Sequence, residues 1–401
     1  MAQAEARDRG AMLLPPGGVT VHLVGRLTPA VLSFLLPAMH ASSAVGRRQA
    51  LLYIDDGISA EPLAALPVNV QRVEVPDSDS LLVRCDALFR ALLRFSGEHP
   101  MNVVHVHGML PALAAARLLR GSAHPGVDVL FSPHSSRVLG WAVAKHAVLG
   151  RMRLPGERDN ALRVIANVQR EARLLAPFGG LAVQVIDCPV SREFFDVPRK
   201  EASRPLVLSC NLEYHRAALD GFQRAAVLLN DDRLGINFHW LGNTAAQGVA
   251  ALRAAGVTCF EASTTRSRAS RFGTAWVYVA TCDERGFPIR LAEAMAAGLP
   301  CVALDTETHR SMVIPGETGF LYANVREMLE RIGQLIDSEQ LRHQMGQAAR
   351  HEAELRFSES EFQRRFWRAI GPNGQSTPQD ALNENPSMRP GQPPANSPTC
   401  S

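Results

Sequence analysis

The sequence has few cysteines, few aromatic residues and no long hydrophobic run. Its seven cysteines, spread over 401 residues, form no Cys-x-x-Cys pair and no zinc-finger spacing, which excludes a disulfide scaffold and predicts reduced thiols. Without a run of about 18 apolar residues the chain has no candidate membrane-spanning helix. Glu5 and Asp8 precede any apolar segment, so we expect no signal peptide and a cytoplasmic location. The net charge of +3 does not favour a nucleic-acid binder.

The sequence has enough hydrophobic residues to form more than one hydrophobic core. Hydrophobic residues make up 46% and charged residues 20% of the sequence, which is typical of globular proteins, and the length predicts two or three domains. Residues 1–17 and 371–401 are polar and rich in turn-forming residues. We predict that both ends are disordered, because they bury too little apolar surface to offset the entropy of ordering.

Strand-like and helix-like segments alternate along the rest of the sequence. Residues 80–95 have leucines near a spacing of 3.6 and predict a helix, and residues 103–106 predict a buried strand. The other strands predicted in this half are residues 19–24, 51–54, 70–75, 127–132, 164–166 and 183–186. This alternation predicts a mostly parallel sheet with helices on both faces.

A second series of the same kind follows a break at residues 196–205, where two prolines and mixed charges predict a linker. Its predicted strands are residues 206–209, 237–241, 276–280 and 301–304. We therefore predict an α/β protein of two Rossmann-like, doubly wound domains, residues 18–195 and 206–370, facing a central cleft that holds the ligand. The last helix is expected to pack back on the first domain.

The most informative segment is residues 285–305, whose pattern predicts strand, loop, helix, turn and strand. Gly286 permits a tight turn and Pro288 suits the first helical position. The N–H groups near Gly286, Phe287 and Ile289 are then expected to face the cleft and, with the helix dipole, to form an anion site suited to a diphosphate. Glu293 lies in the same helix, where its carboxylate can accept hydrogen bonds from a ribose diol. The alternative is a structural helix with a solvated Glu293.

This segment resembles the donor-binding region of family 4 retaining glycosyltransferases, which have the GT-B fold. The family pattern is Glu-Gly-Phe-Gly/Pro, four residues, then Glu-Ala-Met-Ala-Ala-Gly-x-Pro, and residues 315–321, Pro-Gly-Glu-Thr-Gly-Phe-Leu, match a second family motif. The resemblance is detailed over residues 276–322 and extends to both domains in layout. It implies a metal-independent hexosyltransferase with a nucleotide-sugar donor, UDP- or GDP-linked, as co-substrate and no other cofactor.

The resemblance assigns donor-site roles residue by residue. Glu293 takes the place of the ribose-binding Glu. Arg285 stands where the family has its first Glu, and Glu284 is adjacent to it. In the diphosphate-binding motif of the family, Asn211 replaces the Arg and Arg216 replaces the Lys. Arg216, Arg285 and the helix N-terminus would thus stabilise the leaving diphosphate, and retention requires no protein nucleophile.

Two histidine-bearing strand ends resemble the acceptor side of the family. His107 ends the predicted strand 103–106 and is, with Arg285, a predicted catalytic residue that contacts the sugar or the acceptor; the alternative is a structural histidine. His105 alternates with it and is expected to pack inside. His134 and Ser135 follow the next strand and are predicted to line the acceptor side.

Other charged motifs are given structural interpretations or left open. Asp77-Ser78-Asp79 mimics a metal-binding Asp-x-Asp motif but is interpreted as a turn and helix cap, so no metal site is predicted. Residues 134–173 carry eight Lys and Arg residues against three Asp and Glu residues, with Trp141 among them. This segment fits either peripheral contact with an anionic membrane, suiting a lipid-linked saccharide acceptor and surface polysaccharide synthesis, or a solvated helix face.

Two alternatives to an active transferase remain open. The residues at Asn211, Arg285 and 307–311, which differ from the family motifs, favour a catalytically impaired glycosyltransferase-like partner or binding subunit. A GT-B-fold epimerase is a weaker alternative, because the Glu-Ala-Met-Ala-Ala-Gly helix favours a transferase.

Overall fold

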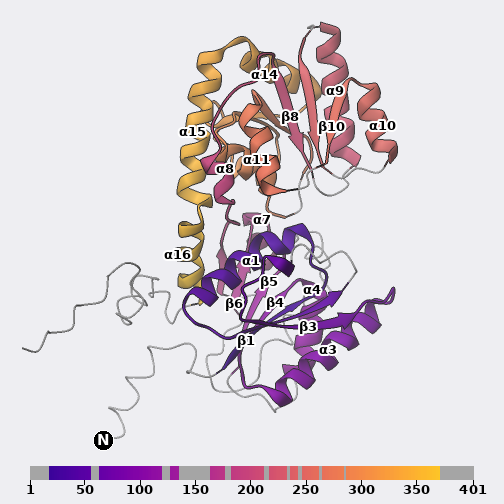
Figure 1. The fold of residues 1–401 in the computed structure, drawn as a ribbon, viewed down its shortest axis with the longest axis vertical. Helices are drawn as coiled ribbons and strands as arrows, with labels where there is room; N and C mark the ends of the chain where they lie inside the picture. Colours follow the sequence, from indigo (N-terminus) through magenta and orange to yellow (C-terminus); the bar gives the residue numbers. More distant parts are fainter. Residues whose placement is uncertain are drawn as a thin grey trace, which may run out of the picture.

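Two α/β domains follow one another along the chain (Figure 1). The computed structural model describes residues 18–55, 63–119, 127–134, 163–176, 182–211, 216–232, 235–242, 246–261, 264–283 and 286–370. Each domain is built on one sheet whose strand pairs are all parallel. The predicted architecture of two Rossmann-like doubly wound domains is therefore confirmed.

The first sheet has seven strands in the order β3-β2-β1-β4-β5-β6-β7. The strands are β1 (Val19–Val24), β2 (Gln49–Asp55), β3 (Val70–Pro76), β4 (Met101–His107), β5 (Asp128–Ser132), β6 (Arg163–Ala166) and β7 (Ala182–Val185). The helices between them are α1 (Pro29–Ala44), α3 (Leu81–Glu98), α4 (Met109–Leu119) and α7 (Gln169–Leu175). The strand order reverses between β1 and β4, which makes this pair the topological switch point of the first domain.

The second sheet has six strands in the order β10-β9-β8-β11-β12-β13. They are β8 (Leu206–Cys210), β9 (Asn237–Leu241), β10 (Val257–Phe260), β11 (Val277–Ala280), β12 (Cys301–Leu304) and β13 (Gly319–Tyr322). The helices are α9 (Arg216–Asp232), α10 (Ala246–Ala254), α11 (Thr265–Thr274), α12 (Ile289–Ala296), α13 (Glu307–Arg310), α14 (Val325–Asp337) and α15 (Glu339–Phe357). Here the order reverses between β8 and β11, the second switch point.

The sequence pattern located most elements but misjudged some faces and ends. In α3 the buried residues are Leu88, Leu92 and Phe95, whereas Leu81 and Leu82, assigned to the same apolar stripe, are exposed. The helix predicted from residue 288 begins one residue later, at Ile289. Strands β10 and β13 were missed, because each has four residues and no long β-branched run.

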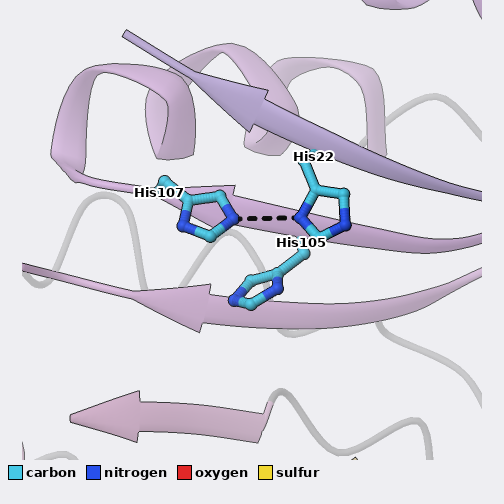
Figure 2. A group of neighbouring side chains, drawn as sticks. All are labelled: His22, His105 and His107. Atoms are coloured by element: carbon cyan, nitrogen blue, oxygen red, sulfur yellow. Dashed lines mark hydrogen bonds between the residues drawn. The ribbon is translucent and has the colours of Figure 1, made fainter. Parts of the chain in front are cut away.

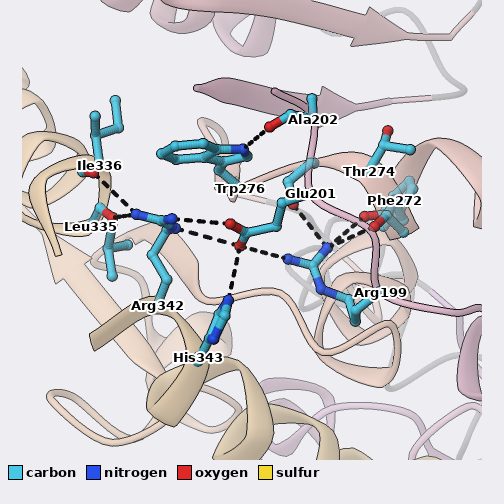
Figure 3. Close-up of polar contacts among 12 residues, drawn as sticks. Arg199, Glu201, Ala202, Phe272, Thr274, Trp276, Leu335, Ile336, Arg342 and His343 are labelled. Carbon is cyan, nitrogen blue, oxygen red and sulfur yellow. Dashed lines mark hydrogen bonds and ion pairs between the residues drawn. The ribbon is translucent and has the colours of Figure 1, made fainter. Parts of the chain in front are cut away.

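The chain passes between the domains through α8 (Arg192–Asp196) and an extended segment that is fixed to the second domain (Figure 3). Arg199 donates to three backbone carbonyls around the end of α11. Glu201 accepts from Arg342 of α15 at 3.0 Å, and the Arg342 guanidinium lies 3.8 Å from the ring centroid of Trp276. The Trp276 indole N–H donates to the carbonyl of Ala202 at 2.9 Å. The segment predicted as a linker is thus packed on the second domain.

The last described helix, α16 (Glu359–Ile370), returns to the first domain, where it contacts α1 and β6 (Figure 1). Its Phe362 and Phe366 pack edge-on against Phe34 of α1, at ring-centroid distances of 5.3 and 6.2 Å. The chain therefore crosses between the domains twice, before β8 and after α15. Among the helices of the described ranges, none combines the length and apolar character needed to cross a membrane.

Candidate functional site

A buried ion pair lies in the helix that carries the most informative motif. Glu293 of α12 is 4% exposed, and its Oε1 is hydrogen-bonded to Arg290 one turn earlier and lies 3.4 Å from Nη2 of Arg268 in α11. The other carboxylate oxygen, Oε2, is buried without a hydrogen-bond partner. The surrounding alanines of α12 let this helix pack with all its residues from Arg290 to Ala296 buried. Glu293 is therefore not solvated: it contacts two arginines through Oε1, and its Oε2 has no partner.

This ion pair sits at the switch point of the second sheet. Arg290 interacts electrostatically with Cys210, the last residue of β8, and with Tyr278 of β11, and the Tyr278 hydroxyl lies 3.4 Å from the Cys210 carbonyl. Burial works against the charged Arg290 guanidinium, but the ion pair with Glu293 outweighs it and holds the pKa of Arg290 above its usual value. The carboxyl ends of parallel strands at a switch point are where α/β proteins bind ligands.

Asn211 directly follows β8 at the same edge. Its N–H donates to the carbonyl of Leu241 at 2.8 Å, which ties the end of β8 to the end of β9. Gly242 is required beside it: a Cβ there would lie 1.7 Å from the Asn211 carbonyl oxygen, and the φ of Gly242 is +147°. The Asn211 side chain approaches the sulfur of Cys282 at 3.8 Å. The structure thus brings Asn211 to the edge that also holds Arg290.

The other charged residues predicted for the donor site either have a different partner from the Arg290–Glu293 pair or fall outside the described residues. Arg216 begins α9, where its side chain is 83% exposed and lies 3.7 Å from Asp220. Glu284 and Arg285 fall in a range that the structure does not describe. Their predicted roles remain predictions.

The loop before α12 lies against the first domain. A Cβ on Gly286 would approach the carbonyl oxygen of His134 to 3.0 Å, and Phe287 and Ile289 pack on the apolar cluster formed by α1, α16 and the first sheet. The N–H of Ile289 donates to the carbonyl of Phe287 at 2.9 Å, and Pro288 has no N–H. The expectation that the Ile289 N–H is free to bind an anion is therefore wrong, because that group is used inside the loop.

Four histidines gather at the switch point of the first sheet. His22 of β1 contacts His107 of β4 (Nδ1 to Nε2, 3.2 Å), and His107 contacts His134 after β5 (Nδ1 to Nε2, 2.9 Å). His105 contacts Ser132 through Nε2 at 2.9 Å and is fully buried, as predicted. Burial lowers the pKa of His22 and His134 to about 4 and the pKa of His105 and His107 well below its usual value. All four imidazoles are therefore neutral near pH 7.

The structure brings His107 and His134 into contact, although the sequence predicted only that each lies on the acceptor side. Both ring nitrogens of His107 are within hydrogen-bonding distance of other histidines, and its side chain is buried. His134 adopts the left-handed backbone conformation, with φ of 56°, and its carbonyl meets the loop at Gly286. His134 therefore lies between His107 and the second domain. Ser135 falls outside the described residues.

Two ion pairs join the domains beside these two edges. Arg170 of α7 lies 3.1 Å from Asp283, which follows β11, and Arg173 of α7 pairs with Glu307 of α13. Glu307 stands where the family resemblance places a glycine-rich turn, and here it bonds to the first domain. Both pairs are half-exposed, so each contributes little stability. The first links α7 to the residues after β11, and the second links α7 to α13.

Two further sequence motifs are the acidic motif at residues 77–79 and the basic segment 134–173. Asp77 forms ion pairs with Arg26 and Arg84, each at 2.7 Å. The cap of α3 is Ser80, one residue after the motif in which the cap was predicted. Most of the basic segment 134–173 falls outside the described residues, so membrane contact stays a prediction.

Three functional candidates were missed from the sequence: Arg290, Arg268 and His22. The spacing of Arg290 and Glu293 by three residues within a predicted helix is a signal for a side-chain pair. Arg268 is 25 residues from Glu293, and His22 is 85 residues from its partner His107, so no local pattern indicated either contact.

Comparison with known proteins finds a family model that matches part of the second domain. Residues 234–352 match the family model described as Glycosyl transferases group 1. A curated relative, EpsD of Bacillus subtilis, carries the name of a glycosyltransferase and is 37% identical over 86 residues, which is 21% of this chain. The match spans only 22% of the length of EpsD.

Solved structures with the same fold match nearly the whole chain. Sucrose-phosphate synthase from Thermosynechococcus elongatus superposes with a TM-score of 0.66 at 16% identity, over 88% of this chain and 96% of its own. Anabaena HepE, solved with UDP and glucose, gives a TM-score of 0.67 at 14% identity (86% and 97% covered). A TarM variant of S. aureus, whose complex includes UDP, gives 0.69 at 11% identity (90% and 100% covered). The chain thus has the fold of GT-B glycosyltransferases.

Proposed function

We propose that this protein is a metal-independent, retaining glycosyltransferase of family 4, which moves a hexose from a nucleotide-sugar donor to a saccharide or lipid-linked saccharide acceptor. The observation that carries the proposal is the buried Glu293 with its unused Oε2, at the switch point of a domain that matches glycosyl transferases group 1. The HepE and TarM structures contain UDP, which supports a nucleotide-linked donor for this chain.

In this proposal the second switch point binds the donor. Oε2 of Glu293 accepts from the ribose diol, while Arg268 and Arg290 hold the carboxylate in place through Oε1. Arg290, beside the end of β8, also supplies positive charge on the side where the diphosphate lies, where the family has an Arg and this chain has Asn211. A guanidinium already buried and oriented loses little entropy on binding phosphate oxygens.

Charge stabilisation on the leaving diphosphate is then the main contribution to catalysis. As the glycosidic bond breaks, negative charge grows on the diphosphate, and arginines fixed at a dry edge stabilise it with no further reorganisation. The acceptor hydroxyl enters on the face that the diphosphate leaves, so configuration is retained without a protein nucleophile. Arg216 and Arg285 are proposed to add further positive charge to the diphosphate site.

The first domain forms the acceptor side. His134, between His107 and the Gly286 loop, is placed to contact sugar hydroxyls when the domains separate, and His107 acts through it as a positioning residue. The His107–His134 contact, at 2.9 Å, fixes the ring plane of His134. Surface polysaccharide synthesis, cytoplasmic location and peripheral contact with an anionic membrane are part of the proposal on the strength of the sequence alone.

Calorimetric titration of the purified chain with UDP, GDP, ADP and their sugars tests this function. We expect one nucleotide to bind, and Glu293→Gln to weaken it at least tenfold, about 1.4 kcal/mol. The matched control is Glu330→Gln, which makes the same change in an exposed ion pair on α14 and should leave affinity unchanged. Equal binding by Glu293→Gln would contradict the assignment of Glu293.

The absence of binding by every nucleotide would instead favour the catalytically impaired partner. Two observations support that alternative: Asn211 stands at the position of a cation, and Glu307 pairs with Arg173 across the domains. In that case the ion pairs around α7 would keep the cleft closed, and the search would turn to a protein that this chain binds.

A further inference from the structure

The histidines of the first switch point form a set that can hold a metal ion. His105 and His107 are two residues apart on β4, so their side chains lie on the same face of the sheet. His22 of β1 is paired in register with His105 on the neighbouring strand. One ring nitrogen from each of the three lies within 4.8 Å of the other two, and all three side chains are at most 2% exposed. Figure 2 shows the three rings turned toward one another.

The hydrogen bonds around His22 decide which of its nitrogens is available. The Gln49 amide donates from Nε2 to the Met39 carbonyl at 2.9 Å and to the Ser43 hydroxyl at 2.8 Å. Its Oε1 is therefore the atom that faces Nε2 of His22 at 3.1 Å, and that nitrogen must carry the proton. In the neutral imidazole Nδ1 is then a bare lone pair, directed at His107. This is the form in which histidine binds a metal, with its other nitrogen donating to a fixed oxygen.

One of the three distances between ligand nitrogens matches that around a tetrahedral ion, and all three lie within 4.8 Å. With Zn–N bonds of about 2.0–2.1 Å, two ligand nitrogens of a tetrahedral site lie about 3.3 Å apart, and Nδ1 of His22 lies 3.2 Å from Nε2 of His107. Nδ1 of His105 is buried without a hydrogen-bond partner, while its Nε2 is held by Ser132. An unpartnered ring nitrogen in the interior costs free energy, which coordination would recover.

There is also room for a further ligand. A cavity of about 20 Å³ adjoins His22 and His105 but not His107, and its other polar lining consists of Thr20, Ser42, Asp128 and the arginines 47 and 163. Space of this size holds about one water molecule. Three imidazoles and a water complete the four-coordinate arrangement that zinc adopts when protein supplies three ligands.

We propose that the first domain binds one late first-row divalent metal ion, with zinc the best match, through Nδ1 of His22, Nδ1 of His105 and Nε2 of His107. The ion ties β1 to β4 at the switch point. It also fixes His107 as the Nδ1–H tautomer, which donates to Nε2 of His134 and so orients that ring. The ion takes no part in glycosyl transfer, and the proposal stands whether or not the chain transfers sugars.

The test uses the full chain, stripped of metal with a chelator and then titrated with Zn²⁺ or Co²⁺ alone, without nucleotide. We expect one ion per chain, a rise in the thermal unfolding midpoint with Zn²⁺, and the visible absorption of a four-coordinate Co²⁺ site with nitrogen ligands. No stoichiometric binding by the unmodified chain overturns the proposal. So does a thiolate-to-Co²⁺ charge-transfer band, which would place the ion on cysteines.

Variants locate the ion. His105→Gln keeps a group that reaches Ser132 but lacks the ring nitrogen. We expect this variant to bind Zn²⁺ about 100-fold more weakly or worse, a larger loss than that caused by replacing a residue that does not bind the metal directly. His343→Gln changes a half-exposed histidine of the second domain and should bind as the unmodified chain does. Full affinity in a folded His105→Gln protein overturns the proposal. If that variant does not fold, the Co²⁺ spectrum of the unmodified chain decides.

Discussion

The two switch points of this molecule have the same topology and opposite chemistry. In the first domain the edge between β1 and β4 is filled by neutral imidazoles, whose pKa values are lowered by burial. In the second domain the edge between β8 and β11 holds a buried ion pair, in which Glu293 keeps the pKa of Arg290 high. One edge offers uncharged lone pairs and the other fixed charge. Two similar folds thus provide two different binding sites, because the ligand chemistry depends on a few side chains at the strand ends.

The buried glutamates of the two domains show the same contrast. Glu293 has two arginines within 3.4 Å. Glu171, in α7 of the first domain, has no cation hydrogen-bonded to it among the described residues; Oε2 accepts from the N–H of Asn167 at 2.8 Å, and Oε1 is unpartnered. Burial raises the pKa of Glu171 to about 7. Glu171 of the first domain is therefore buried without a hydrogen-bonded cation among the described residues, whereas Glu293 of the second lies in an ion pair with two arginines.

The largest expected loss of stability comes from a substitution at the charged edge of the second domain, between β8 and β11. Glu293→Ala leaves the buried Arg290 and the neighbouring Arg268 without their carboxylate, and we expect a loss of about 3–5 kcal/mol in the free energy of unfolding. Glu330→Ala, in an exposed pair with Arg326, should lose less than about 1 kcal/mol. Urea unfolding followed by circular dichroism measures both. Equal small losses would mean that Glu293 is solvated and would remove the contrast between the two edges.

Glu171, the buried glutamate of the first domain, should change the free energy of unfolding with pH in the opposite direction to an ion-paired carboxylate. Because the pKa of Glu171 is about 7 in the folded chain and near 4.5 when unfolded, its contribution to stability is complete below pH 4.5 and is lost as the pH rises through 7. Glu171→Gln should therefore gain stability relative to the unmodified chain between pH 5 and pH 8, by up to about 3 kcal/mol. Unfolding curves at the two pH values test this, and a constant difference would contradict it.

The smallest expected loss of stability comes from a substitution at the contact between the two domains. Arg173→Gln removes the half-exposed contact with Glu307, and we expect a loss below about 1 kcal/mol, since exposed ion pairs contribute little. The loss should vanish in 1 M salt, where the Debye length is about 3 Å. Urea midpoints at low and high salt measure it. A loss above about 2 kcal/mol that persists in high salt would show that the domains are held by more than charge at α7.

The sequence was sufficient for what depends on local pattern. The buried strand at 103–106 was recognised from its β-branched residues and extends from Met101 to His107. The pattern of residues 285–305, with Pro288 at the predicted first helical position, located the start of α12 within one residue. The same local signals placed Glu293 in a helix and His107 at the end of a strand, near the carboxyl edges of their sheets.

What the sequence could not give depends on contacts between distant segments. Gln49 fixes the tautomer of His22 through a hydrogen bond across β1 and β2, and Arg268 reaches Glu293 from another helix. The Ile289 N–H was predicted to be free because a helix start has unpaired donors, yet a turn within the loop uses it. In the first two cases the partner is distant in the sequence, whereas in the third it is a carbonyl two residues earlier in the same loop.

The central claim is that the nucleotide binds at the charged edge of the second domain and not at the neutral edge of the first. Hydrogen–deuterium exchange, with and without the nucleotide found by calorimetry, tests it most directly. We predict slower exchange in peptides that cover residues 206–211 and 277–296, and unchanged exchange in residues 101–107. Protection confined to residues 101–107 would contradict the account and place the donor among the histidines.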